Sequence, residues 1–240
     1  MNIDRNGRAH PPLPAREAAI AGALARPLGA PALDRFVEPG DRVAVLQDES
    51  LPPDLRALAA GSIAEALAAA GAAEVAAVVC AAPSPPPPRD GDEPPPGEVL
   101  ARDAGARSDA LPPAHGPDAE QGERFVAVGR APRLGVVRLL AEVARADKLV
   151  LLGSCTSDPR GVLSGAGALV AWGSADAITR DALRAAAGDE TSAEEAIDAV
   201  LLLAPPAFAV QLVLAPGGRL GGVVAGDPSS VREACTKRVK

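Results

Sequence analysis

The residues best suited to chemistry lie in one loop, Asp158 to Ala168, which reads DPRGVLSGAGA. The loop follows the apolar run 148–153, which is typical of a buried strand. Loops of small residues at the carboxyl end of a strand expose backbone amides, and ligands of α/β proteins usually bind there. Asp158 could exchange a proton and Ser164 could donate a hydrogen bond, but the loop contains no Lys and no His. It therefore predicts a binding site that lacks most of the groups needed for catalysis.

Outside this loop the candidates are few. Ser164 has no neighbouring base and is not in a G-x-S-x-G turn, so a helix cap or a ligand donor is favoured over a nucleophile. Asp48, at the end of an expected strand, is either a site residue or a simple turn former. The only histidines are His10 and His115, both in irregular segments, and no metal site is predicted. The glycine-rich stretches match neither the dinucleotide-binding nor the P-loop spacing.

Apolar periodicity predicts alternating elements. Helices are expected at 16–26, 52–70, 137–145, 176–187, 192–203 and 229–238, and strands at 42–48, 74–81, 125–128 and 148–152. A Pro-Gly-Gly turn between 208–214 and 220–225 indicates an antiparallel hairpin. The fold class is therefore α/β, with a mostly parallel, Rossmann-like layered sheet, helices on both faces and a late antiparallel hairpin.

The expected organisation is a disordered amino terminus at 1–14 followed by one α/β domain at 15–240. A Pro-rich, irregular insert at about 83–121 interrupts this domain, because Pro85-Pro86-Pro87-Pro88 fits neither a helix interior nor a central strand.

Composition excludes several classes of protein. A net charge of -7 argues against nucleic acid as a partner. Pro205-Pro206 divides the longest apolar run, 199–215, so no membrane span is expected. The amino terminus lacks a secretory apolar region. Three cysteines without C-x-x-C spacing favour a reducing, cytoplasmic location over a disulfide framework.

Several segments, taken in order, resemble the amino-terminal domain of the lactate racemase (LarA-like) family, the nickel-pincer-nucleotide enzymes. Residues 42–52 resemble a strand followed by "D-x-T-R-P", and the loop at 158–168 resembles "P-H-x-x-x-G-F-S-G-G-x-K". Residues 146–153 resemble the family's "ADl-I-iG" run, and 208–228 resemble its hairpin ending in "aGDP". The resemblance covers most of the chain and implies the fold of that domain.

Carried over residue by residue, the resemblance implies a degenerate site. The lysine that tethers the cofactor corresponds to Ala168, the nickel-ligand histidine to Asp181 or Ala182, and a loop acid/base histidine to Asp158. The second acid/base histidine falls at Ser84 or Pro85, and the arginine of "D-x-T-R-P" is Leu51. The cofactor-binding positions that remain are Asp48, Ser50, Ser164 and Gly165.

Three functions remain open. The first is a catalytically silent LarA-like domain that binds a small molecule or a second-domain-like protein partner through the loop face, with no cofactor predicted. The second is a nickel-pincer-nucleotide-dependent racemase or epimerase of 2-hydroxy acids that borrows the missing groups from a partner chain. The third is a non-enzymatic interaction module whose resemblance is limited to the fold. Racemisation needs a base on each face of the reacting carbon, and one carboxylate cannot replace two imidazoles and a metal.

Overall fold

A computed structural model describes residues 13–80, 124–155, 166–186, 190–215 and 217–239. Its main sheet has the strand order β2-β1-β5-β6-β7. The strands are β1 (Arg42–Asp48), β2 (Glu74–Cys80), β5 (Lys148–Cys155), β6 (Ala207–Ala215) and β7 (Arg219–Gly226). The first four are parallel to one another, and β7 pairs antiparallel with β6. The predicted α/β class, with its mostly parallel sheet and late hairpin, is confirmed.

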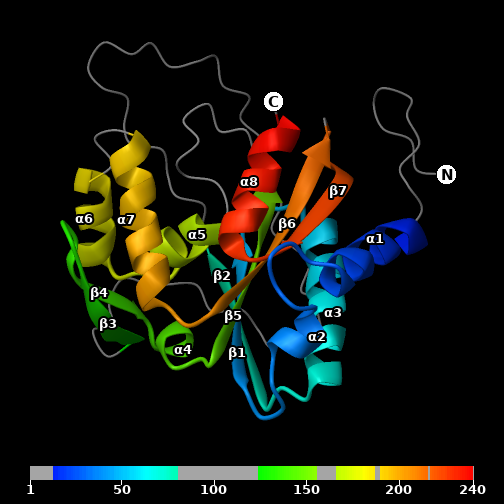
Figure 1. Cartoon of the computed structure of the whole chain (residues 1–240), viewed down its shortest axis with the longest axis horizontal. Helices are drawn as coiled ribbons and strands as arrows, with labels where there is room; N and C mark the ends of the chain where they lie inside the picture. The colour runs from blue at the N-terminus through cyan, green and yellow to red at the C-terminus, as the bar shows by residue number, and fades with distance from the viewer. Residues whose placement is uncertain (1–12, 81–123, 156–165, 187–189, 216, 240) are drawn as a thin grey trace.

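Helices cover both faces of this sheet (Figure 1). One face is covered by α1, α2 and α3, which span Leu13–Ala25, Leu33–Phe36 and Pro53–Ala70. The other face carries α5 (Ala166–Ala168), the π-helix η2 (Leu169–Gly173), α6 (Ala177–Ala186), α7 (Glu190–Leu203) and α8 (Pro228–Val239). The ranges of α1, α3, α6, α7 and α8 agree with the helices expected from apolar periodicity to within a few residues.

The alternation of side chains along β1 explains why both faces need a cover. Val43 and Val45 point into the apolar cluster beneath α1, α2 and α3, whereas Ala44 and Leu46 point into the opposite cluster. All four are at most 1% exposed. The sequence of a strand that is buried on both faces is a continuous run of apolar residues, and this pattern predicts β1.

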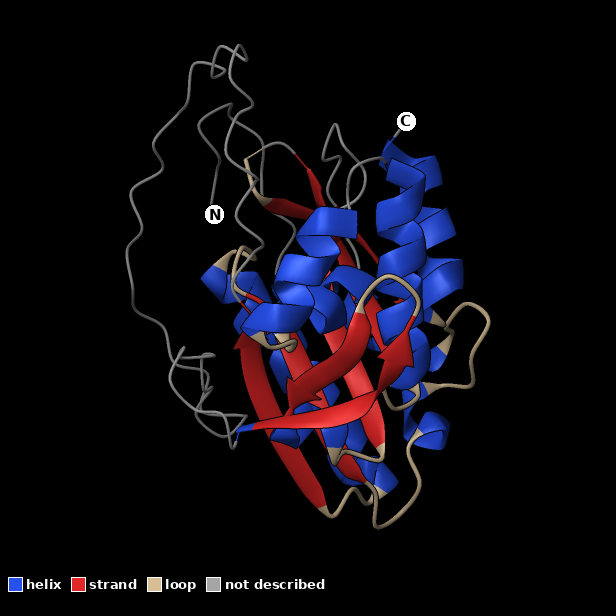
Figure 2. Cartoon of the chain, turned by 90° about the vertical axis from the view of Figure 1, so that its left-hand side faces the viewer, coloured by secondary structure: helices blue, strands red, loops and turns tan. Residues whose placement is uncertain are grey.

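The expected helix at 137–145 is wrong over its first half. Residues Gly135–Leu140 form β4, which pairs antiparallel with β3 (Phe125–Ala131), and only Ala141–Ala144 is helical, as α4. Val137 and Leu139 are fully buried while Val136 and Arg138 are exposed, which is the period-two pattern of a strand with one buried face. The β3–β4 sheet lies on the side of the molecule that faces the viewer in Figure 2.

Two of the predicted segments fall wholly or mostly outside the described residues. Of the amino terminus predicted to be disordered at 1–14, residues 1–12 precede the described part of the chain, and Leu13 and Pro14 belong to α1. The Pro-rich insert predicted at 83–121 lies within the gap between Cys80 and residue 124. None of the described helices is long and apolar enough to cross a membrane.

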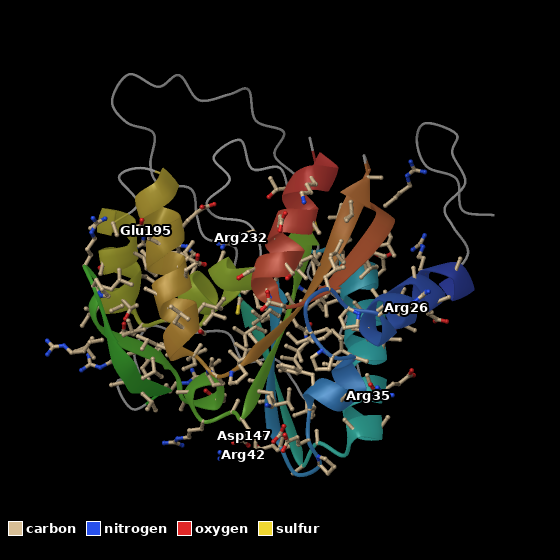
Figure 3. All side chains as sticks on the ribbon, in the orientation of Figure 1. Arg26, Arg35, Arg42, Asp147, Glu195 and Arg232 are labelled. Carbon is tan, nitrogen blue, oxygen red and sulfur yellow. A yellow bond between two sulfur atoms is a disulfide. The ribbon has the colours of Figure 1, made fainter. Side chains whose placement is uncertain are left out.

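An ion pair between Arg42 and Asp147 links the amino ends of β1 and β5, and Figure 3 labels both residues there. Asp147 Oδ2 accepts hydrogen bonds from the Arg42 backbone N–H at 2.9 Å and from Arg42 Nε at 3.2 Å. The Asp147 N–H donates in turn to the Arg42 carbonyl oxygen at 2.7 Å. The side-chain hydrogen bond from Arg42 is the main reason that the pKa of Asp147 is lowered, and the backbone bond adds to it.

We expect the Arg42→Ala substitution to raise the pKa of Asp147 toward the ordinary aspartate value, as measured by carboxyl-detected NMR titration. Because the folded-state pKa is the lower one, Asp147 stabilises the protein above the unfolded pKa of about 3.9. That stabilisation is lost as the pH falls through the folded-state pKa. Arg35→Ala, which removes another surface arginine, is the control and should leave the Asp147 titration unchanged; equal titration in both variants would contradict the assignment.

Candidate functional site

The carboxyl ends of the parallel strands gather at one edge of the main sheet. β1 ends at Asp48, β2 at Cys80 and β5 at Cys155. The chain leaves β1 for β2 on one side, while β5 lies on the other side of β1 and leads on to β6. This reversal makes the β1–β5 junction the topological switch point, where open α/β sheets bind their ligands.

A row of residues crosses the sheet at this edge, and its members come from three adjacent strands. Farther inside, Leu46 pairs with Leu151, and Leu151 pairs with Ala209; all three are fully buried in one apolar cluster. Two residues further along each strand, on the same face, lie Asp48, Gly153 and Gln211. At this level of the sheet, the apolar side chains are therefore replaced by a carboxylate (Asp48), a glycine (Gly153) and an amide (Gln211). We name these three residues the polar row.

Asp48 forms a turn and is also a member of the polar row. Its Oδ1 accepts a hydrogen bond from the Ser50 backbone N–H at 2.8 Å, and its carbonyl oxygen accepts one from Leu51 N–H at 3.3 Å. This Asx turn carries the chain from β1 toward α3. Asp48 and Ser50, both predicted from the sequence, therefore lie together, and the turn is the contact that joins them.

Cys80 extends the row by one strand, since it pairs with Asp48 in the β1–β2 register. Burial, followed by the charge of Asp48, raises the pKa of the Cys80 thiol to about 12, so the thiol stays protonated at neutral pH. Gly173 of η2 packs directly on it: a Cβ atom at Gly173 would lie 2.4 Å from the Cys80 Cβ. The π-helix η2 can approach the sheet this closely only because residue 173 has no side chain.

Gln211 is the site residue that the sequence interpretation missed. Its side chain is 1% exposed, and within the described part of the chain neither Oε1 nor Nε2 has a hydrogen-bond partner. A Cβ atom at Gly153 would lie 3.0 Å from Nε2 and 3.1 Å from Oε1, so the amide lies over Gly153. The available signal was a single polar residue within the apolar strand Phe208–Leu214, which reads FAVQLVL.

Three of the predicted site residues, Asp158, Ser164 and Gly165, lie outside the described residues, within the gap at 156–165. The described chain resumes in α5, where Ala168 is 5% exposed and packs in the apolar cluster of this face. Leu51 is also buried, at 2% exposure, in the cluster on the opposite face. Over the described ranges, no group of three or more His, Cys, Asp or Glu side chains is arranged to hold a metal ion.

The structure corrects the expectation that the cysteines are unpaired. Cys155, at the end of β5, forms a disulfide with Cys235 of α8 across a sequence separation of 80 residues. Cys80 is the free cysteine and is buried. The sequence interpretation relied on the odd number of cysteines and on their wide spacing. Neither reports spatial proximity, because α8 returns to pack against β5 only in the tertiary structure.

No protein-family model and no curated protein sequence matches this chain. Its structure is similar to that of the lactate racemase apoprotein from Thermoanaerobacterium thermosaccharolyticum, with a TM-score of 0.64 and 15% sequence identity. The similarity covers 92% of this chain and 54% of the racemase, so the chain spans about half the length of that protein. At this identity the similarity shows a LarA-like fold.

Proposed function

We propose that this chain is a catalytically silent, LarA-like amino-terminal domain that binds a small molecule at the carboxyl edge of its main sheet. The observation that carries the proposal is the polar row at the switch point, which combines a carboxylate with a buried amide that has no hydrogen-bond partner among the described residues. Buried polar groups are normally hydrogen-bonded, so an unpartnered amide beside a carboxylate at this edge of the sheet supports a role in binding.

The described residues do not fit a nickel-pincer nucleotide. The position that corresponds to the tethering lysine is Ala168, whose methyl group cannot form a covalent link and is buried among apolar neighbours. The nickel-ligand position corresponds to Asp181 or Ala182. Asp181 is exposed on α6 and accepts a hydrogen bond from Arg184, one turn along the same helix. Neither position offers an imidazole to a metal.

The two described lysines do not support a tether at this site. Lys148 lies at the amino end of β5, opposite the polar row, and stacks over the Phe36 ring at 5.2 Å. Lys237 lies in α8, where its ammonium group pairs with Glu233 one turn earlier. Lys240 is the last residue of the sequence and lies beyond the described part. Binding without racemisation is the function that this set of side chains supports best.

The test is to express the full chain in cells that synthesise the nickel-pincer nucleotide. We expect an unmodified intact mass, nickel well below one ion per chain, and no interconversion of L- and D-lactate. The racemase from Thermoanaerobacterium thermosaccharolyticum, produced in the same cells, is the positive control. Stoichiometric nickel or racemisation by the isolated chain would overturn the proposal. Activity that appears only when a second polypeptide is added would favour a racemase that borrows its missing groups from a partner.

A further inference from the structure

We infer that the outer face of the β3–β4 sheet is a docking surface for a partner protein, and that it binds an acidic segment in which carboxylates alternate with aliphatic side chains. The surface consists of Arg130, Val136, Arg138 and the neighbouring Ile178 of α6, and we name these residues the basic face. The polar row belongs to a different sheet. The inference therefore goes beyond the proposed small-molecule site and does not depend on it.

One face of the β3–β4 sheet is buried, and the other is open. Val137 and Leu139 are fully buried in the apolar cluster that also contains residues of α6 and α7. The alternate residues Val136 and Arg138 point the other way and are exposed. Arg130 pairs with Val136 in the register, so its exposed side chain lies on the same open face. In Figure 2 no described helix or strand lies in front of this face.

The basic face is positively charged, although the chain as a whole is acidic. Residues 124–145 contain five arginines and one acidic residue, in a chain whose net charge is -7. Figure 3 shows several nitrogen-bearing side chains that project outward from the β3–β4 end of the molecule.

The arginines of the basic face are poorly neutralised. Arg130 forms no ion pair with any described residue, and Arg138 reaches Asp176 Oδ2 only at 3.9 Å, which is too long for a hydrogen bond. The two arginines occupy diagonal cross-strand positions, which are roughly 7–8 Å apart, so their charges repel each other. Like charges on one open face are explained by a partner of the opposite charge.

Two exposed aliphatic side chains lie beside these arginines. Val136 is 37% exposed and Ile178 is 65% exposed. The start of α6 is hydrogen-bonded to β4, since the Arg138 N–H donates to Thr179 Oγ1 at 3.2 Å and the Asp176 N–H donates to the Arg138 carbonyl oxygen at 3.1 Å. These bonds place Ile178 next to Arg138. Arginines beside exposed apolar residues are typical of protein–protein interfaces.

The composition of the basic face favours a protein over a nucleic acid. Its residues include no aromatic side chain on which a base could stack, and two of them are aliphatic. The net charge of -7 repels a long polyanion, whereas a short acidic segment experiences mainly the nearby arginines. Carboxylates accept paired hydrogen bonds from guanidinium groups, and aliphatic residues between them can cover Val136 and Ile178.

The test titrates the isotope-labelled full chain with the capped peptide Glu-Leu-Glu-Leu-Glu-Glu and follows backbone amide shifts by NMR. We expect the shifts to centre on the basic face and the affinity to fall as salt is added. Arg130→Glu should weaken binding about tenfold. It should not lower the Tm, because the new carboxylate lies diagonally opposite Arg138. Arg35→Glu, at an exposed arginine of α2, is the matched control and should leave the affinity unchanged.

A second variant tests the apolar part of the basic face. Ile178→Ser should weaken binding of this peptide but not of Glu-Ser-Glu-Ser-Glu-Glu, which has the same charge and no aliphatic side chains. Leu28→Ser, at another exposed leucine-sized residue with 43% exposure, is its control.

Absent binding, amide shifts centred elsewhere, or equal weakening by Arg130→Glu and Arg35→Glu would each overturn the inference. Tighter binding of single-stranded oligothymidylate at the same residues would assign the face to nucleic acid instead. Shifts of these amides that depend on protein concentration without peptide would assign it to a second copy of the chain, and either result would also overturn the inference. The nickel and racemisation assays decide the proposed function separately.

Discussion

Replacing Gly226 with alanine is expected to lower the free energy of unfolding by about 4 kcal/mol, from backbone strain and overpacking together. Gly226 has a φ of +135°, and a Cβ atom there would lie 2.1 Å from the carbonyl oxygen of Leu28. Leu28 is held on both sides of this contact: its N–H donates to Ala225 O, and its carbonyl oxygen accepts from Asp227 N–H, both at 2.8 Å. The methyl group would have to break this bridge, which fixes the segment after α1 to β7. Chemical denaturation followed by circular dichroism measures the change.

The matched control for this substitution is Gly61→Ala in the middle of α3. A Cβ atom at Gly61 meets nothing within 4 Å, and its φ is not positive. Since alanine favours the helix over glycine, this variant should gain roughly 0.5–1 kcal/mol. A Gly226→Ala protein as stable as the wild type would show that the Leu28 bridge is dispensable.

The second large effect is expected from the Cys155–Cys235 disulfide. Because the bond closes a loop with a sequence separation of 80 residues, its removal by Cys235→Ser should lower the free energy of unfolding by about 4 kcal/mol. The physical reason is that the unfolded chain regains the conformations that the crosslink forbids. Urea denaturation of the variant and the oxidised wild type, compared at one pH, measures the difference.

Cys80 provides the control for the disulfide experiment. Native oxidised protein should show no thiol that reacts readily with iodoacetamide, because Cys80 is buried and its pKa is raised to about 12. Unfolding without reductant should expose this one thiol, and unfolding with reductant should expose all three cysteines of the chain. A Cys80→Ala variant should still lose stability on reduction. Three reactive thiols in unfolded, unreduced protein would rule out the disulfide.

The sequence predicted the elements whose patterns are local. Strand β1 was recognisable from its apolar run, and α3 from apolar residues at helical spacing that end at Gly71. Residues 137–140 misled the prediction, because a short apolar stretch followed by Ala141–Ala144 fits a helix as well as a strand. Pairing with β3 makes these residues a strand, and the apolar pattern of 137–145 alone does not report that pairing.

The same distinction, between local sequence patterns and contacts made only in the tertiary structure, applies to the candidate site. Asp48 and Ser50 were identified from the sequence, and they are two residues apart in one turn. The place of Gln211 in the polar row was missed because Gln211 lies beside Gly153, which is distant in sequence and adjacent only through the β5–β6 register. The Cys155–Cys235 pair was missed for the same reason.

What the sequence determined by itself was the α/β class, the order of most elements and the absence of lysine and histidine from the loop at 158–168. These follow from residue identity and from periodicities of two and 3.6, which a single chain displays locally. Only the tertiary structure decided the register of the strands, and hence the polar row, the orphaned amide and the disulfide. Register is set by backbone hydrogen bonds and by packing between distant segments, which no local pattern specifies.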